Sequence, residues 1–482
     1  MQITGREEEL SILKEIYEDP EPHFLAVYGR RRIGKTFLIS EFFKDKGVYF
    51  ETTGVKQGKL AEQLFQFSFE FSRIFGEGNK IAIPKSWSEA FQKLQEAVEK
   101  IQDKKIILFF DEAPWLASHK SGFLRALEHF WNRYLSKNPQ IILIVCGSSA
   151  SWIIKKIIYD KGGLHNRVTR KLRLLPFSLR EVELYLKSRQ IELDRKQIAD
   201  LYMAFGGVPK YLSYVKRGHS VAQTIGLTCF SDKGALYEEF SALYSSLFEN
   251  SEHHIAVIQA LAEIISGMTK NDLLKKAGLT SGGSSSKTIQ ELIDAGFIMY
   301  IPPFGKKKID GKYRICDEYS FFYLSWVKKL ARTNLENGNG EFWMKKQGTA
   351  DWYTWSGYAF ESLCLKHITS IKKALGISGV ETVASGWWVQ ARDTEEKGAQ
   401  IDLVIDREDK CVNLCEIKYG DSEFLITKSY AENLKSKKNI FRNRTETRKA
   451  LFTTLITPYG VQKNSHALAS VDRELILNDL FY

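Results

Sequence analysis

The stretch Phe24-Leu25-Ala26-Val27-Tyr28-Gly29-Arg30-Arg31-Arg32-Ile33-Gly34-Lys35-Thr36 decides the fold of the N-terminal part of the chain. Its apolar run predicts a buried strand, the glycines predict a tight loop, and Thr36 to Phe43 continues with the pattern of a helix. The loop has the spacing GxxxxGK[ST], which arises by chance in about one chain of this length in fifty. Its place between a strand and a helix therefore predicts a phosphate-binding loop (P-loop).

Each residue type in this loop has a physical role in binding a nucleotide. Gly29 and Gly34 let the backbone approach phosphates, so that N–H groups and the N-terminus of the helix point at them. Lys35 can neutralise charge on the β- and γ-phosphates, and the Thr36 hydroxyl can hold Mg²⁺. We therefore expect ATP and Mg²⁺ as ligands. Arg30 to Arg32 occupy variable positions of the pattern and are expected to face outward.

A second apolar run, Ile106 to Phe110, ends in Asp111 and Glu112. Asp111 can hold Mg²⁺, and Glu112 can orient and deprotonate the attacking water. An apolar strand followed by two acids is common and by itself indicates only a strand entering a loop. Because it follows a P-loop here, the sequence favours a site for ATP hydrolysis.

Two further polar residues are candidates for this site. The apolar run Ile141 to Cys146 is followed by Ser148, whose hydroxyl would meet the γ-phosphate or the attacking water; helix capping is the alternative. Arg167 lies in a loop that leads toward a helical region and could reach a γ-phosphate, with a surface ion pair as the alternative. The sequence leaves open whether Arg167 acts in its own chain or in a neighbouring copy of a homo-oligomer.

The order of these elements predicts an α/β fold built from several domains. Residues 1–175 are expected to form a parallel-sheet core covered by helices on both faces. Ser178 and Glu181 form a capping box that opens an all-helical lid at residues 176–250. Residues 251–327 have the order of a winged helix-turn-helix, with helices expected at Ile255 to Ile265, Lys270 to Ala277 and Lys287 to Ala295, a serine-glycine turn at Thr280 to Ser286, and two strands around a basic hairpin. Residues 328–482 return to mixed helix and strand.

Seven elements occur in an order that resembles a known family: Thr4 to Leu10, the loop Gly29 to Thr36, Asp111-Glu112, Gly147-Ser148-Ser149, Arg167, Pro176-Phe177-Ser178 and Gly206-Gly207-Val208-Pro209. Together they resemble the archaeal-type ATPase family, which lies among the AAA+ and STAND P-loop proteins. The resemblance covers about residues 1 to 325. It implies that the opening segment lies beside the nucleotide base and that the Gly-Gly-x-Pro segment packs against the nucleotide from the helical lid.

Near the C-terminus, two strands are predicted at Gln400 to Asp406 and Cys411 to Lys418. If their hairpin is centred on Asp409, Asp402 lies opposite Glu416, and the period of two puts Lys418 on the same face. Two carboxylates suit a divalent metal such as Mg²⁺ or Mn²⁺, and the lysine can position or activate a water that attacks phosphate. Asp402, Glu416 and Lys418 are therefore candidate catalytic residues, and the two acids are candidate metal ligands.

Two other acids compete for a place in this centre. Glu361, in a helix that opens near Gly357, is a candidate third metal ligand, and Asp406 competes with Asp402. A helix, an aspartate in one strand and Glu-x-Lys at the end of the next resemble the PD-(D/E)XK nuclease superfamily, which implies a nuclease-like domain; Ile401 replaces the usual proline. The alternative is a domain that keeps this fold without cleavage, with Lys418 and Glu416 forming an ordinary cross-strand ion pair.

The charge balance of 69 basic against 58 acidic residues, a net of +11, points to a polyanion partner such as nucleic acid, with DNA expected here; a lysine-rich solubilising surface is the alternative. Candidate DNA contacts are Ser284 to Ser286 at the start of the expected recognition helix and Lys306 to Lys308 in the expected wing. A second basic tract contains Lys435, Lys437, Lys438, Arg442, Arg444, Arg448 and Lys449, with Phe441 among them. A solvated helix surface and a protein-docking winged helix are the alternatives.

Composition limits the remaining function classes. The six cysteines lack zinc spacing and are expected to be reduced thiols in a cytoplasm. The apolar runs are far shorter than the roughly 20 residues of a membrane span, so no membrane partner is expected. The sequence thus predicts a cytoplasmic protein that hydrolyses ATP and couples the nucleotide state to DNA binding, with metal-dependent DNA cleavage left open. The alternatives are a nucleotide-operated switch with an inactive nuclease-like domain, and a toxin–antitoxin or defence component that acts on RNA or protein.

Overall fold

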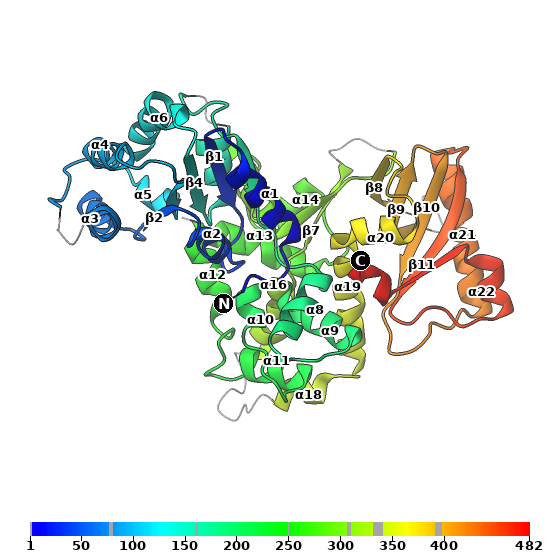
Figure 1. Cartoon of the computed structure of the whole chain (residues 1–482). Coiled ribbons are helices and arrows are strands. Elements are labelled where there is room, and N and C mark those ends of the chain that lie inside the picture. The colour runs from blue at the N-terminus through cyan, green and yellow to red at the C-terminus, as the bar shows by residue number, and fades with distance from the viewer. Residues whose placement is uncertain are drawn as a thin grey trace. The chain divides into compact units, whose positions relative to one another are not determined.

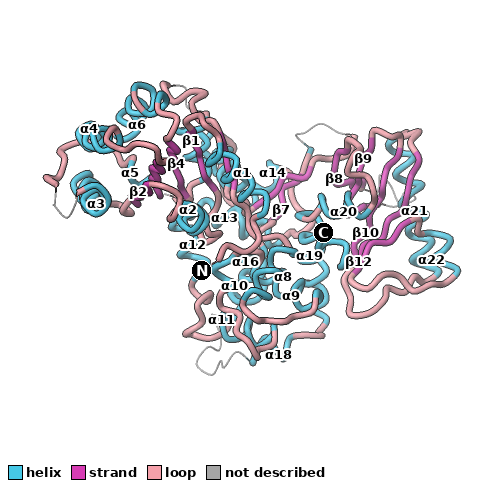
Figure 2. Tube along the Cα trace, in the orientation of Figure 1, coloured by secondary structure: helices cyan, strands magenta, loops and turns pink. Residues whose placement is uncertain are grey.

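The computed structural model describes residues 2–76, 81–159, 162–248, 250–305, 310–330, 341–390 and 398–482. The chain forms two compact units, Met1–Pro176 and Phe177–Tyr482. Figure 1 colours the chain from the N-terminus to the C-terminus, and Figure 2 colours it by secondary structure. The expected wing lysines, Lys306 to Lys308, lie outside the described residues.

A five-stranded sheet in the order β2-β3-β4-β1-β5 forms the centre of the first unit. Neighbouring strands are all parallel. The strands are β1 (His23–Tyr28), β2 (Val48–Thr53), β3 (Ile106–Asp111), β4 (Ile141–Gly147) and β5 (Arg170–Arg173). The carboxyl ends of β1, β3 and β4 therefore meet at one edge of the sheet, where the candidate nucleotide residues follow each strand.

Helices cover both faces of this sheet. Successive side chains of a strand point to opposite faces, so they pack in two different cores. In β3, Ile107 and Phe109 pack in one core with α1 (Glu7–Glu18) and α2 (Lys35–Phe43). Leu108 and Phe110 pack in the other core, with α3 (Leu60–Phe75), α4 (Trp87–Val98) and α6 (Phe123–Arg133). Shorter turns complete the unit: α5 (Ala113–Leu116), a 3₁₀ turn (Leu135–Lys137), α7 (Ala150–Ile153) and a π-helical turn (Ile154–Ile158). The predicted α/β core is confirmed.

The second unit begins with helices only, as the sequence predicts for this segment. Ser178 caps the first of them, with the expected reciprocal bonds to Glu181. The helices are α8 (Leu179–Ser188), α9 (Arg195–Phe205), α10 (Pro209–Leu212), α11 (Val221–Cys229) and α12 (Glu239–Leu247).

Three helices and an antiparallel hairpin follow: α13 (Ser251–Glu263), α14 (Lys270–Lys276), α15 (Gly283–Asp294), β6 (Ile298–Ile301) and β7 (Lys312–Ile315). The order agrees with the prediction, but the expected serine-glycine turn at Thr280 to Ser286 is partly wrong, because α15 already begins at Gly283. The hydroxyls of Ser285 and Ser286 donate to the carbonyl oxygens of Thr280 and Gly282, so these serines support the first helical turn.

The last part of the chain contains a mixed sheet in the order β12-β11-β10-β9-β8. Its strands are β8 (Thr382–Val389), β9 (Ala399–Arg407), β10 (Cys411–Ile417), β11 (Ala450–Thr457) and β12 (Arg473–Ile476). Its helices and those leading to it are α16 (Glu318–Phe322), a π-helical turn (Tyr323–Val327), α17 (Lys328–Leu330), α18 (Glu341–Lys346), α19 (Ala350–Lys366), α20 (Ile368–Ala374), α21 (Lys428–Thr445), α22 (Ser465–Ser470) and a 3₁₀ turn (Leu477–Phe481).

One hydrophobic core runs through the second unit, from Phe177 and α8 to Phe481. It contains side chains from the helical segment, from α13 to β7 and from the mixed sheet. The division of this unit into a lid, a winged helix and a nuclease-like domain stays a prediction. Across the ranges given above, no helix combines the length and apolar character that a membrane span requires.

Candidate functional site

The loop between β1 and α2 has the backbone that a phosphate-binding loop requires. Gly29 has a φ of 150°, and a Cβ built on it would lie 2.2 Å from the carbonyl oxygen of Leu174. Gly34 has a φ of 88°. Lys35 is 6% exposed, and its Nζ donates to the carbonyl oxygens of Gly29 and Arg30, each at 3.0 Å. These oxygens position the ammonium without neutralising it, because they carry no net charge.

Thr36 and Asp111 meet at the carboxyl edge of the sheet. The Thr36 hydroxyl donates to Oδ2 of Asp111 at 2.7 Å, and Asp111 is buried at the end of β3. A hydroxyl and a carboxylate are hard oxygen ligands, the type that Mg²⁺ prefers. The two residues predicted to hold Mg²⁺ therefore fit that ion.

Glu112 is fixed beside them in an uncommon backbone conformation. Its φ of 46° and ψ of 48° lie in the left-handed region, which is uncommon for non-glycine residues. Oε2 of Glu112 accepts from the Ser148 backbone N–H at 3.2 Å and from the Ser148 hydroxyl at 2.8 Å. Ser148 therefore orients the candidate catalytic base, whereas the N-cap position of α7 is Ser149, whose side chain makes no capping bond.

The structure adds one residue to this edge and corrects an expectation for another. Tyr49 donates to Glu51 at 2.6 Å in β2, and burial, with a smaller contribution from the charge of Asp111, raises the pKa of Glu51. An acid directly after the apolar residues Val48 to Phe50 of this strand was the signal that could have found Glu51. Arg30 was expected to face outward, but the structure buries it, with only 3% of its surface exposed.

In the second unit, β9 and β10 form the predicted hairpin in the predicted register. The pairs run from Val412 with Asp406 to Cys415 with Leu403, and the next position places Glu416 opposite Asp402. Lys418 Nζ lies 3.7 Å from Oδ2 of Asp402 and 3.7 Å from Oε2 of Glu416. Asp402 also accepts from the backbone N–H of Ile417 at 2.9 Å. The three predicted residues therefore converge.

Lys437, from α21, completes the surroundings of Glu416. Its Nζ donates to both carboxylate oxygens of Glu416, each at 2.8 Å. Burial and then the charge of Asp402 raise the pKa of Glu416 to about 7, against the opposing effect of Lys437. Lys437 was predicted as a nucleic-acid contact; here it pairs with the candidate metal ligand.

Glu361, the expected third metal ligand, is engaged in an ion pair, and its role as a ligand stays a prediction. Glu361, on α19, pairs with Nη1 of Arg314 from β7. Burial raises the pKa of Glu361, and the nearby charge of Asp402 adds to this effect. Within the described ranges, no group of three His, Cys, Asp or Glu residues is arranged to hold a metal ion. Asp402 and Glu416 remain as a pair of oxygen ligands suited to a divalent cation.

Asp406 lies apart from this centre. It stands opposite Val412 near the hairpin turn, and its carboxylate accepts from Lys449 Nζ at 2.6 Å. Asp402 is therefore the better candidate of the two aspartates.

Comparison with known proteins assigns the first site to a family. Residues 3–215, which include every residue from Gly29 to Ser148, match the model of a family described as an ATPase domain predominantly from Archaea. Residues 3–215 of the chain belong to this family of archaeal-type ATPase domains. The ATPase also matches, over residues 323–433, a family described as archaeal and bacterial proteins of unknown function. That second match contains Glu361, Asp402, Glu416 and Lys418.

One relative matches most of the chain, and another matches a short segment. An uncharacterised protein of Methanocaldococcus jannaschii is 24% identical over 435 residues, which is 87% of the ATPase and 88% of that protein. An uncharacterised ATP-binding protein of the same organism is 37% identical over 46 residues, 10% of the ATPase and 78% of that protein. The solved structure of a Walker-type ATPase from Pyrococcus abyssi aligns with 67% of the ATPase and 96% of its own chain, at 19% identity and a TM-score of 0.47.

Arg167 does not join the P-loop of its own chain through the sheet. β5 runs parallel to β1, and the N–H of Thr169, just before β5, donates to the carbonyl oxygen of Phe24. Arg167 therefore precedes the edge at which β1 begins, whereas the loop follows the edge at which β1 ends. Its side chain is exposed. A role for Arg167 in a neighbouring copy stays a prediction.

The expected wing hairpin of the ATPase is docked on the mixed sheet. The backbone of Gly386 in β8 exchanges hydrogen bonds with Pro302 and Phe304, each at 3.0 Å. The ring of Phe304 packs 5.0 Å from that of Phe441. Phe441 was expected among the nucleic-acid contacts, but it is fully buried against Phe304 and Trp387 and is not available for stacking on a base.

The expected recognition helix is only partly available to a partner. Ser285 is buried and its hydroxyl donates to Thr280, so it was wrongly assigned to phosphate contact. Ser286 donates to Gly282 and accepts from Lys270 Nζ at 2.7 Å. Ser284 and Lys287 are exposed.

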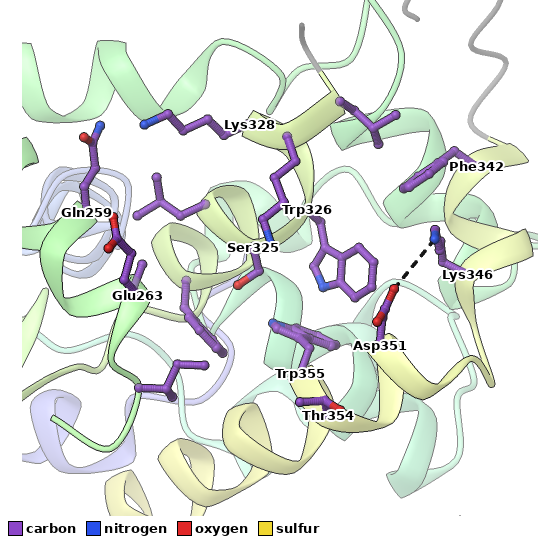
Figure 3. Close-up of a pocket in the computed structure, with 16 residues that line it drawn as sticks. Gln259, Glu263, Ser325, Trp326, Lys328, Phe342, Lys346, Asp351, Thr354 and Trp355 are labelled. Atoms are coloured by element: carbon purple, nitrogen blue, oxygen red, sulfur yellow. Dashed lines mark ion pairs between the residues drawn. The ribbon is translucent and has the colours of Figure 1, made fainter. Parts of the chain in front are cut away.

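A cavity of about 1020 Å³ lies elsewhere in the second unit (Figure 3). Trp326 and Trp355 contribute aromatic walls, and Asp351 pairs with Lys346 at 4.0 Å. Leu330 and Phe342, also in its lining, border residues 331–340, which lie outside the described ranges. We assign no ligand to this cavity.

Proposed function

We propose that the ATPase hydrolyses ATP with Lys35, Thr36, Asp111 and Glu112 and uses the nucleotide state to control a DNA-binding, nuclease-like second unit. The observation that carries the first part is the pair of contacts at the sheet edge, Thr36 with Asp111 and Glu112 with Ser148. They provide a metal-ligand pair, from the first turn of α2 and the end of β3, and a base oriented by the residue that follows β4.

Each residue has a separate task in this proposal. Lys35 neutralises charge on the β- and γ-phosphates, and Glu112, held by Ser148, takes a proton from the attacking water. Thr36 and Asp111 hold Mg²⁺, which supplies charge neutralisation at the phosphate oxygens. Gly29 keeps the loop close to the phosphates, because a larger residue would meet Leu174.

DNA is the polyanion that we propose for the second unit. The net charge of +11 supports such a partner, and Lys287 on α15 with Lys435, Arg442 and Arg448 near α21 offers exposed cations. Lys437 and Lys449 are less suited to this task, because they pair with Glu416 and Asp406.

Metal-dependent cleavage at Asp402, Glu416 and Lys418 is the activity that we propose for the mixed-sheet centre. Lys418 lies at the same distance, 3.7 Å, from both carboxylates, which suits an ammonium that positions a water between two metal ligands and a phosphate. Asp402 and Glu416 would hold Mg²⁺ or Mn²⁺, which supplies Lewis-acid activation of the phosphate when bound.

The experiment is a cleavage assay on linear, branched and single-stranded DNA with Mg²⁺ or Mn²⁺, with and without ATP. Wild-type protein should cut at least one form, and Lys418→Ala and Asp402→Ala should not. Asp406→Ala is the matched control, because it removes the same group from the same strand outside the centre, and it should cut like the wild type. Cutting that survives both Lys418→Ala and Asp402→Ala would remove the nuclease assignment.

The second candidate function is a nucleotide-operated switch that binds DNA without cutting it. It is favoured by the pairing of Lys437 with both oxygens of Glu416 and of Arg314 with Glu361, which together leave little negative charge for a metal. Calorimetric titration with Mn²⁺ in the absence of nucleotide separates the two. Binding that Asp402→Ala abolishes and Asp406→Ala retains supports a nuclease; absence of binding in the wild type supports the switch.

A further inference from the structure

A polar cluster joins helix α9 to the loop that follows Lys418. Lys196, on α9, is 13% exposed and pairs with Asp421 at 3.0 Å and with Asp200 at 3.1 Å. Its Nζ also donates to the Tyr419 oxygen at 2.5 Å, and Tyr419 in turn donates to Asp200. The Tyr353 hydroxyl donates to Asp421 at 2.9 Å. The residues after Lys418 are thus held mainly by one helix from a distant part of the sequence.

This anchoring matters for Lys418 itself. The Tyr419 ring packs 5.4 Å from Phe360 and 5.8 Å from Trp352, so its position is set by α19 as well as α9. The Lys418 backbone N–H ends the ladder with β11, donating to Ile456 at 2.9 Å. The Lys418 ammonium lies 3.7 Å from the carboxylates of Asp402 and Glu416, which is longer than a hydrogen bond. A small shift of Tyr419 would therefore move Lys418 relative to Asp402 and Glu416.

The other end of α9 is tied to the chain that leaves the first unit. Gly207, just after α9, accepts from the backbone N–H of Phe177 at 2.6 Å, and Tyr202 donates to the Phe177 oxygen at 2.9 Å. A Cβ on Gly207 would lie 1.8 Å from that oxygen. Phe177 is therefore clamped to α9 by two hydrogen bonds and close packing.

A short covalent segment leads from this clamp to the P-loop. Leu174 donates its backbone N–H to the carbonyl oxygen of Tyr28 at 2.8 Å, and its own oxygen lies against Gly29. Only Leu175 and Pro176 separate Leu174 from Phe177. A change in the backbone of the loop on exchange of ATP for ADP is thus connected, through contacts and covalent bonds alone, to α9.

We propose that α9 couples the nucleotide state of the P-loop to the position of Lys418, with Lys196 and Tyr419 as the positioning residues. The inference rests on the proposed function, since it regulates the same two sites. An intact helix moves as a unit, so displacement at its Gly207 end shifts the Lys196 end and loosens or tightens Tyr419 and Asp421. The two states are α9 engaged with Tyr419 and α9 displaced from it, and the nucleotides must bind them with different affinity.

Hydrogen exchange of backbone amides in the full chain tests this coupling without requiring DNA cleavage. The exchange is measured in the Glu112→Gln variant, which should hydrolyse ATP slowly, once with ATP bound and once with ADP bound. We expect exchange in residues 417–421 to differ about fivefold or more between the two nucleotides, the lower end of typical coupling between sites. Lys196→Met in the same background should abolish that difference while protection of the P-loop by ATP remains.

Two further variants serve as a control for the loss of charge and as a second way to break the contacts of Tyr419. Lys187→Met removes an equivalent charge from α8, where Lys187 is exposed and pairs with Glu183 one helical turn away, and should leave the difference unchanged. Tyr419→Phe keeps the ring packing but removes both hydroxyl bonds, so it should act like Lys196→Met even if that variant folds poorly. A difference that persists in Tyr419→Phe, or equal exchange with ATP and ADP in the parent, overturns the coupling. Absence of ATP protection at Gly29–Thr36 would instead overturn the nucleotide site, and the coupling with it.

Discussion

Replacing Glu416 with glutamine should stabilise the second unit at alkaline pH, although the change removes an acid from the candidate centre. Glu416 is 3% exposed, and Lys437 contacts both of its oxygens. Burial and the neighbouring charge of Asp402 nevertheless raise its pKa from 4.5 to about 7. The fold therefore disfavours the ionised carboxylate, which is typical of a residue retained for activity at some cost in stability.

The pH dependence of this effect follows from the raised pKa. The stability that protonated Glu416 contributes is fully present below pH 4.5 and is lost as the pH rises through about 7. At about 1.4 kcal/mol per pH unit, the loss reaches about 3 kcal/mol at pH 8. Glutamine cannot ionise, so Glu416→Gln avoids this loss. The two proteins should have nearly equal stability at pH 4.5 and differ most above pH 7.

Thermal unfolding followed by tryptophan fluorescence measures the difference. Six of the ten tryptophans lie in the second unit, so the signal reports its unfolding. For a unit of roughly 300 residues, ~3 kcal/mol corresponds to a rise in Tm of about 5 °C at pH 8. Glu432→Gln, on the exposed face of α21, is the control. An equal or lower Tm for Glu416→Gln at pH 8 would refute the reasoning and assign Glu416 to an ordinary structural ion pair.

Three other variants test separate contacts. Ser148→Ala should lower ATP turnover roughly tenfold or more with little change in ATP affinity, because Glu112 loses the orienting bond from the Ser148 hydroxyl and keeps only the longer one from the backbone N–H; Ser149→Ala is the neighbouring control, and equal turnover in both variants would contradict the role of the Ser148 hydroxyl. Gly29→Ala should abolish ATP binding measured by calorimetry, since its Cβ would lie 2.2 Å from the Leu174 oxygen at a φ of 150°; unchanged affinity would show that the loop adapts. Arg314→Met should destabilise the second unit by about 3–5 kcal/mol in thermal unfolding, because the buried Glu361 carboxylate loses its partner. Adding Glu361→Gln should recover part of that loss, and a single variant as stable as the wild type would mean that the pair contributes nothing.

Much of the fold follows from local patterns in the sequence. The central residues of β1, β3 and β4 form continuous apolar runs because both faces of these strands are buried, so the sequence identified them as strands. β5 was not predicted, because Arg170–Arg173 is a polar edge strand in which only Leu172 is buried. The early start of α15 was missed because serine and glycine favour turns, whereas here Ser285 and Ser286 bond back to the helix backbone.

In the candidate sites too, the sequence predicts residues that are placed by local pattern and misses those that tertiary packing brings in. The register of the β9–β10 hairpin could be predicted, since a short turn fixes which residues face each other, and this brought Asp402 opposite Glu416. Lys437 and Arg314 could not be assigned, because they reach the centre from another helix and from the distant hairpin strand β7. The same limit applies to Phe441, which an isolated basic tract suggests for stacking and which tertiary packing buries.

ATP hydrolysis at the Gly29–Thr36 loop is tested most directly by measuring Mg²⁺-dependent phosphate release and ATP affinity for the wild type and Lys35→Ala. Lys35 is buried and held over the loop by two carbonyl oxygens, so its loss should remove both ATP binding and turnover. Lys44→Ala, just beyond the far end of the same helix, where Lys44 is 49% exposed, should leave both intact. Turnover and affinity that are unchanged in Lys35→Ala would contradict the assignment of the site.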